Sequence, residues 1–156
     1  MSRVQLALNV ADLDASIEFY TKLFQTPPAK VRPGYANFAV ADPPLKLVLF
    51  AGAGEPGTLN HIGVEVETTE QVAAAVARAA DQQLPNIVQE NTTCCFAVQD
   101  KVWIQGPEND WEFYTVLADA PVIESDGGCC ATTEEMSVSS TSDAPDHNPL
   151  APSRCC

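Results

Sequence analysis

Two adjacent cysteines, Cys94 and Cys95, are the residues of this sequence with the most specific chemistry. They follow the polar run Asn91-Thr92-Thr93, whose composition predicts a turn. A disulfide between chain neighbours closes a strained ring and cross-links no loop, so the pair is not expected to stabilise the fold in that way. Two thiolates can instead bind one soft centre, such as trivalent arsenic or a cadmium ion. The alternative is that both cysteines are small, buried apolar residues.

Three further residues together predict a metal site: Gln5, His61 and Glu112. One imidazole, one carboxylate and one amide oxygen make a variant of the facial triad with open coordination positions, which suits non-haem Fe(II) and dioxygen. Taken singly, each residue is more simply explained as a structural group. The weakness of the set is the amide, because a neutral glutamine is a poorer donor than a second imidazole. The case for a metal therefore depends on whether the fold brings the three side chains together.

An internal repeat supplies the reason to group them. The segment Val4–Val10 alternates apolar and other residues, as a half-buried strand does, and Asn60–Val66 has the same pattern. His61 then falls where Gln5 falls. The helix-capping residue Thr68 likewise falls where Asp12 falls. Strands from the two halves that line one concave sheet would let the candidate ligands converge.

Each half is predicted to contain a strand, a helix and three more strands. The helices are expected after Asp12 and Thr68, and the later strands at 29–32, 35–41 and 46–51 in the first half and at 86–90, 96–105 and 111–116 in the second. Lys46 is expected at the position equivalent to Glu112, so the first half lacks that carboxylate. The predicted fold class is α+β, with tandem βαβββ modules (about 1–52 and 59–118) forming an open, incomplete barrel over residues 1–118.

Residues 119–156 differ in composition from the rest of the chain. They are rich in Asp, Ser, Thr, Pro and Gly and show no apolar periodicity, so we predict a disordered, acidic tail. Two more cysteine pairs lie in it: Cys129, Cys130, Cys155 and Cys156. These thiols either capture arsenicals or metal ions or have no role.

Charge and hydropathy narrow the range of partners and locations. The net charge of −13 argues against nucleic acid and anionic membrane surfaces, and it favours a neutral or cationic ligand over an anionic one. No apolar run is long enough to span a membrane, and the first residues do not resemble a secretory signal. A cytoplasmic location is expected, where paired thiols stay reduced. Whether two chains form a homodimer is left open.

The repeat resembles the vicinal oxygen chelate superfamily, which includes glyoxalases and extradiol dioxygenases. The segments 4–8, 33–39, 43–49, 60–66 and 92–103 are more closely similar to the ArsI-type carbon–arsenic lyases and the related cadmium-induced proteins called CadI. The vicinal cysteines followed by Gln99-Asp100-Lys101-Val102-Trp103 are the most specific part of this resemblance, because a plain glyoxalase does not carry them. The resemblance covers about residues 1–118.

That resemblance implies an enzyme that uses Fe(II) and dioxygen to break the bond between carbon and trivalent arsenic. By motif position it implies that Gln5, His61 and Glu112 bind the metal and that Cys94 and Cys95 bind the arsenic. The implied substrate is a trivalent organoarsenical, such as methylarsenite or an aromatic arsenical, and the implied product is arsenite.

Two other functions remain open at this stage. The first is a cadmium-induced, thiol-based metal-binding protein without turnover, which the extra cysteine pairs favour but which needs no Gln/His/Glu set. The second is a glyoxalase-like metalloenzyme that uses Ni²⁺ or Zn²⁺, which is weakened by the missing carboxylate in the first half.

Overall fold

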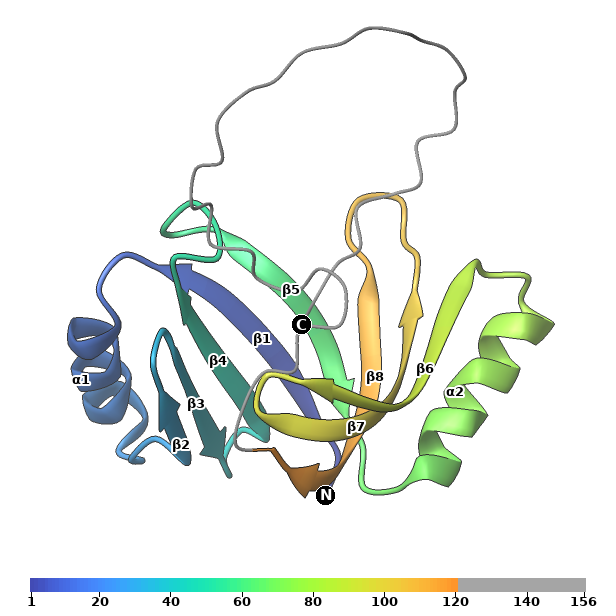
Figure 1. The fold of residues 1–156 in the computed structure, drawn as a ribbon, viewed down its shortest axis with the longest axis horizontal. Coiled ribbons are helices and arrows are strands. Elements are labelled where there is room, and N and C mark those ends of the chain that lie inside the picture. The colour runs from blue at the N-terminus through green and yellow to red at the C-terminus, as the bar shows by residue number, and fades with distance from the viewer. Residues whose placement is uncertain (121–156) are drawn as a thin grey trace, which may run out of the picture.

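The computed structural model describes residues 1–120, which form the two expected βαβββ modules (Figure 1). The elements of the first module are β1 (Arg3–Val10), α1 (Leu13–Phe24), β2 (Lys30–Arg32), β3 (Tyr35–Val40) and β4 (Leu45–Ala51). Those of the second are β5 (Leu59–Glu65), α2 (Thr69–Asp81), β6 (Asn86–Cys94), β7 (Ala97–Ile104) and β8 (Trp111–Asp119).

The strands make one mixed sheet in the order β2-β3-β4-β1-β5-β8-β7-β6, which does not close on itself. The first strand of each module pairs in parallel with the last strand of that module, and the antiparallel pair β1–β5 joins the modules. In Figure 1 the two helices lie on opposite flanks and the strongly curved strands lie between them. The predicted α+β fold with an open barrel is confirmed.

Each helix covers the outer face of its own module. The apolar side of α1, with Ile17 and Tyr20, packs on Phe38 and Leu47, as its period predicts. The helix begins where expected, because the Asp12 carboxylate accepts a hydrogen bond from the backbone N–H of Ala15.

The second helix buries smaller side chains than the first, but its N-terminus is capped more completely. Val72 and Ala75 of α2 pack on Val102. Thr68 and the Gln71 side chain form the predicted capping box. Both helices cover the convex side of the sheet. The side chains on the other face of each strand therefore line its concave side.

The pairing of β1 with β5 sets which side chains meet on that concave face. Gln5 lies opposite Gly63, and His61 lies opposite Ala7, so each candidate ligand has a small residue as its cross-strand neighbour. Gly63 also pairs with Glu112 on the other side, and a Cβ atom there would lie 2.6 Å from the Glu112 carbonyl oxygen. Glycine at this position therefore lets β8 carry Glu112 close to the centre of the sheet.

The same registers correct the expectation for Lys46. Lys46 pairs with Gln5, whereas Glu112 pairs with Gly63, the repeat equivalent of Ala7. Because Ala7 pairs with Val48, the position equivalent to Glu112 belongs to Val48 and not to Lys46. The first module still has no carboxylate there.

The cysteine segment also differs from the predicted turn. β6 continues to Cys94, with an irregularity in the pairing between Gln89 and Thr92 where Asn91 has a φ of 52°. The turn itself is only Cys95-Phe96, with φ values of 49° and 64°. Two central residues with positive φ are typical of the type I′ hairpin turn, which normally selects asparagine and glycine. This turn therefore holds two non-glycine residues in a strained backbone conformation.

Among residues 1–120, no helix is long and apolar enough to cross a membrane. Strand β8 ends at Asp119, and the expectations for the rest of the tail, including its four cysteines, lie outside the described residues.

Candidate metal and thiol site

Gln5, His61 and Glu112 meet on the concave face, where β1, β5 and β8 lie side by side. The Gln5 amide nitrogen is 2.8 Å from His61 Nε2 and 3.0 Å from Glu112 Oε2, and these two atoms are 3.6 Å from each other. All three side chains are buried or nearly so. The structure thus brings together the three residues that the sequence places in separate strands.

The Gln5 amide occupies a point toward which two acceptors are directed. Its two N–H groups reach the unprotonated nitrogen of His61 and the Glu112 carboxylate, while its oxygen accepts a hydrogen bond from the Tyr114 hydroxyl. A cation at that point would find the same nitrogen and oxygen donors. Turning the amide over would add its oxygen as a third donor, because the Tyr114 hydroxyl can accept as well as donate. The donor set therefore fits a divalent metal with nitrogen and oxygen ligands.

Without the glutamine, the described residues hold no metal cluster of the usual kind. No group of three or more His, Cys, Asp and Glu side chains among residues 1–120 is arranged to hold an ion. The amide of Gln5 is accordingly essential to any metal site on this face.

Asn60 fixes the orientation of the His61 ring. Its side-chain oxygen lies 2.7 Å from His61 Nδ1, and its amide donates to Asn9 Oδ1 at 2.9 Å. Asn9 in turn donates to the Thr58 hydroxyl at 2.9 Å. With Nδ1–H directed at Asn60, the lone pair of His61 is on Nε2 and faces Gln5 and Glu112.

The surroundings of the site favour a neutral His61. Burial lowers the pKa of His61, and the positive charge of Lys101 acts in the same direction, which together outweigh the opposite effect of Glu112. Lys101 is itself buried and lies 3.2 Å from Glu112 Oε1. One carboxylate oxygen is thus paired with an ammonium group, and the other faces His61.

Trp103 adds a hydrogen-bond donor beside the imidazole. Its ring stands edge-to-face with His61, at 5.5 Å between centroids. Within residues 1–120, its indole N–H is the one fully buried side-chain polar atom that has no hydrogen-bond partner. Buried donors are normally paired, so this unpaired N–H is an exception among the described residues.

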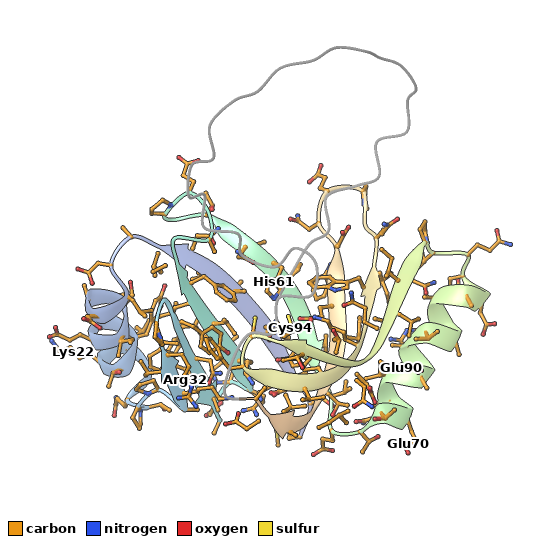
Figure 2. All side chains as sticks on the ribbon, viewed as in Figure 1. Lys22, Arg32, His61, Glu70, Glu90 and Cys94 are labelled. Atoms are coloured by element: carbon orange, nitrogen blue, oxygen red, sulfur yellow. The ribbon has the colours of Figure 1, made fainter. Side chains whose placement is uncertain are left out.

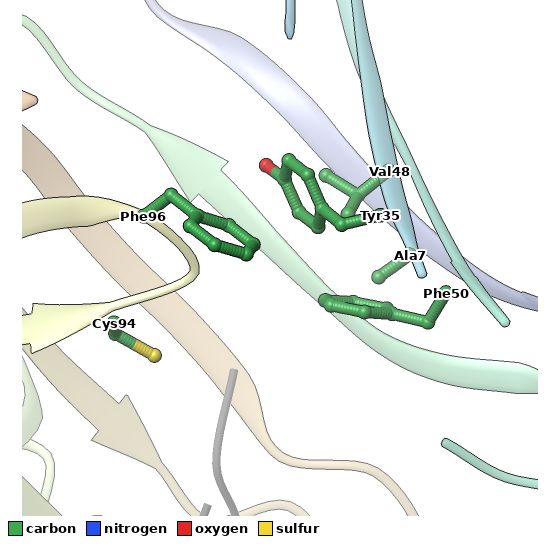
Figure 3. Packing of buried hydrophobic residues seen from close by; sticks show 6 residues of the cluster. All are labelled: Ala7, Tyr35, Val48, Phe50, Cys94 and Phe96. Atoms are coloured by element: carbon green, nitrogen blue, oxygen red, sulfur yellow. The ribbon is translucent and has the colours of Figure 1, made fainter. Parts of the chain in front are cut away.

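The vicinal cysteines approach this face from the tip of the β6–β7 hairpin. Figure 1 shows the hairpin crossing in front of the sheet toward the first module, and Figure 2 shows Cys94 and His61 both in the middle of the molecule. Cys94 and Phe96 pack with Ala7, Val48 and other residues of the first module (Figure 3). The two sulfur atoms are 3.9 Å apart, well beyond the ~2.05 Å of a disulfide bond, so they are not joined to each other.

One cavity of about 240 Å³ connects the two groups of residues. Gln5, His61 and Glu112 line it together with Cys95. Its remaining wall includes the aromatic rings of Tyr35 and Phe50. This volume lies just below the ~300–1,000 Å³ of pockets for drug-sized ligands, so the cavity suits a small molecule with one ring or a short chain.

Lys30 ties the hairpin tip to the first module. Its ammonium group donates to the carbonyl oxygen of Phe96 at 3.0 Å and forms an ion pair with Asp119 at the end of β8. Arg32 lies over the Phe96 ring at 6.0 Å. The turn that carries Cys95 is therefore held by contacts from β2, an edge strand.

The sequence and the fold are similar to those of known proteins. The model of the Glyoxalase/Bleomycin resistance protein/Dioxygenase superfamily matches residues 3–113. The chain belongs to this superfamily. A protein of Thermomonospora curvata named trivalent organoarsenical cleaving enzyme is 56% identical over 88% of this chain and 94% of its own.

Two further comparisons agree with this membership. The cadmium-induced protein CadI of Mycobacterium tuberculosis is 59% identical over 80% of this chain and 83% of its own. Among solved structures, an extradiol ring-cleaving dioxygenase from B. fuscum superposes with a TM-score of 0.55 at 18% identity, over 76% of this chain and 33% of that one. The last likeness shows the shared superfamily fold. The resemblance inferred from the sequence motifs is confirmed.

Several residues of the site were not found from the sequence. Tyr114 shares a strand face with Glu112, and Asn60 precedes His61, so alternation and adjacency were signals that pointed to both. Lys101 and Lys30 carried no such signal, because their partners lie in other strands.

Replacing Asn60 with alanine should weaken metal binding without unfolding the domain. The His61 ring would lose the acceptor that directs its lone pair, and loss of such a partner typically costs about 10–100-fold in metal affinity. Anaerobic calorimetric titration with Fe(II) measures the change, with Asn86→Ala, a partly buried asparagine at the start of β6 and away from the site, as the control. Equal affinity in Asn60→Ala and the unaltered protein would contradict this role.

Replacing Lys30 with methionine should free the hairpin tip. One hydrogen bond to a charged donor contributes roughly 1.5 kcal/mol, which corresponds to about tenfold more opening of the turn. The rate of iodoacetamide labelling of Cys95 in reduced protein, resolved by peptide mass spectrometry, should rise accordingly. Lys22→Met, on the exposed face of α1, is the control. An unchanged labelling rate would show that Lys30 does not hold the turn.

Proposed function

We propose that this protein is an enzyme that cleaves the carbon–arsenic bond of trivalent organoarsenicals, using Fe(II) and dioxygen and releasing arsenite. The observation that carries the proposal is that Cys95, one of two adjacent cysteines, and the Gln5/His61/Glu112 donor set line the same cavity. The name of the T. curvata relative, a trivalent organoarsenical cleaving enzyme, supports the same assignment.

The role of the cysteines is to hold the substrate by its arsenic atom. In the reduced protein, the two thiols react with an organic arsenic dihydroxide so that two S–As bonds form, two As–O bonds break and two water molecules leave. The Cys94 and Cys95 sulfur atoms, 3.9 Å apart, are close enough to share one arsenic. The substrate is then fixed in the cavity, which converts an encounter between separate molecules into a reaction within one complex.

The role of the second residue set is to bind the metal. Gln5, His61 and Glu112 would hold Fe(II), which when bound supplies a site where dioxygen is activated next to the substrate. The neutral His61 nitrogen can donate its lone pair to the metal without first losing a proton. With methylarsenite, one dioxygen accounts for both oxygen atoms gained by the products, arsenous acid and formaldehyde.

Other side chains orient and shield this site. Tyr114 hydrogen-bonds the Gln5 amide, and burial raises the pKa of its hydroxyl well above the usual value, so it remains protonated. Lys101 holds the other oxygen of Glu112. Phe96 at the hairpin tip packs against Tyr35 of the cavity wall, with 5.5 Å between the ring centroids, and so holds the tip beside the cavity.

Thiol capture without turnover is the second candidate function, and the likeness to CadI favours it. Cadmium prefers thiolates to the nitrogen and oxygen donors of the sheet. A protein that only sequesters soft ions has no use for a separate, buried Gln/His/Glu set beside its thiols. The presence of that set in the same cavity favours the enzyme.

The test is arsenite release from methylarsenite by reduced protein loaded anaerobically with Fe(II). Release should require both iron and dioxygen, and it should fall at least 100-fold in Cys95→Ser and His61→Ala, because each removes one half of the site. Lys22→Met should retain full activity. Tight arsenical binding with no arsenite released would overturn the enzyme and leave thiol capture.

A further inference from the structure

The charge of the cavity wall is opposite in sign to that of the whole chain. The chain has a net charge of −13, yet three basic and two acidic side chains line the cavity: Arg3, Lys30, Lys46, Glu65 and Glu112. Nearby charges within a cavity of low dielectric govern a ligand more strongly than distant, screened surface charges. The electrostatic preference of this site must therefore be taken from its own wall.

Two of these five charges are balanced by a partner outside the cavity wall. Glu112 is paired with Lys101, at 3.2 Å, and Lys30 is paired with Asp119. The exception is the cluster of Arg3, Lys46 and Glu65, in which two cations share one carboxylate. This Arg3–Lys46–Glu65 cluster carries one positive charge that no carboxylate of the cavity wall balances.

The cluster is partly buried, so its charge is only partly screened. The side chains of Lys46 and Glu65 are 14% and 12% exposed, and Lys46 Nζ lies 2.9 Å from Glu65 Oε1. Burial by itself raises the pKa of Glu65, but Lys46 and Arg3 together outweigh it and hold that pKa below its usual value. Glu65 is thus ionised at neutral pH, and the cluster keeps a charge of plus one.

Strand register places the cluster at one end of the cavity. Lys46 pairs with Gln5, and Arg3 pairs with Glu65, whereas His61 lies on the far side of Gln5, opposite Ala7. The cluster is therefore next to the candidate metal ligands but on the side away from the imidazole. Tyr114, the partner of Glu65 in β8, adds an aromatic ring to the wall between them.

We propose that the Arg3–Lys46–Glu65 cluster binds an anionic substituent on the organic group of the arsenical. This inference rests on the proposed function and specifies its substrate class: trivalent aryl arsenicals whose ring carries a carboxylate or an ionised phenol. The arsenic is held by the thiols, the ring lies between the aromatic walls, and the anion meets Lys46. An ammonium group has three donors, so Lys46 can serve an anion while keeping Glu65.

Two probes that differ in one charge test the proposal. They are 4-carboxyphenylarsenite and its carboxamide, which have nearly the same size. Binding is measured by calorimetry without iron or oxygen, in the 156-residue chain with the four cysteines beyond residue 120 changed to serine, so that arsenic binds only at Cys94 and Cys95. The carboxylate should bind about tenfold more tightly, which corresponds to about 1.4 kcal/mol.

Variants of the cluster should shift this ratio in opposite directions. Lys46→Met removes the excess charge and should reduce the preference to about one, whereas Glu65→Gln adds a positive charge and should increase it. Lys22→Met, on the outer face of α1, should leave the ratio unchanged. Circular dichroism of each variant checks that it is folded.

The outcomes separate this inference from the proposed function. A carboxylate preference that disappears in Lys46→Met supports the subsite even if no arsenite is ever released. Equal binding of the two probes, or a preference that Lys46→Met leaves intact, overturns the subsite even if arsenite release is observed.

Discussion

The antiparallel pairing of β1 with β5 is the constraint on which the site depends. It places Gln5 opposite Gly63 and His61 opposite Ala7, so two polar side chains of one face share the space that two small residues leave. Gly63 then admits β8 closely enough for Glu112 to reach the same point. A shift of one residue in this register would put Gln5 and His61 on opposite faces of the sheet. The chemistry of the site therefore follows from one strand pair at the junction of two modules.

The two modules have the same order of strands and helix but contribute different residues to the site. The first gives an amide, a cationic end of the cavity and the surface on which the cysteine turn rests, and the second gives the imidazole, the carboxylate and the turn itself. The strained Cys95-Phe96 turn is held in place by packing against Tyr35 and by Lys30. Strain that persists at such a position is retained by its surroundings, which is common where a loop presents functional groups. The result is a soft-ligand site and a nitrogen–oxygen site in a single cavity.

Most of the fold was predictable from the sequence because both halves of the repeat show the apolar periodicities of a strand and of an amphipathic helix. These periodicities depend on local backbone geometry alone. Two features were predicted in this way. They are the N-caps of the two helices, Asp12 and Thr68, and the shared strand face of Gln5, Ala7 and Asn9. The predicted equivalence of Lys46 and Glu112 is wrong because a sequence repeat does not determine strand register, and the register places Val48 at that position. The roles of Lys101 and Lys30 were not predictable, because each depends on a partner brought close only by the folded sheet. The charge of the cavity was not predictable either. The net charge of the chain, −13, does not indicate a cavity wall with one excess positive charge.

The central claim is that Gln5, His61 and Glu112 form one metal site facing the vicinal cysteines. The most direct test is anomalous diffraction at the iron absorption edge from crystals loaded with Fe(II) under anaerobic, reducing conditions. The account predicts a single strong peak bonded to His61 Nε2, a Glu112 oxygen and the Gln5 amide oxygen. A peak at the cysteines instead, or none between β1, β5 and β8, would contradict it.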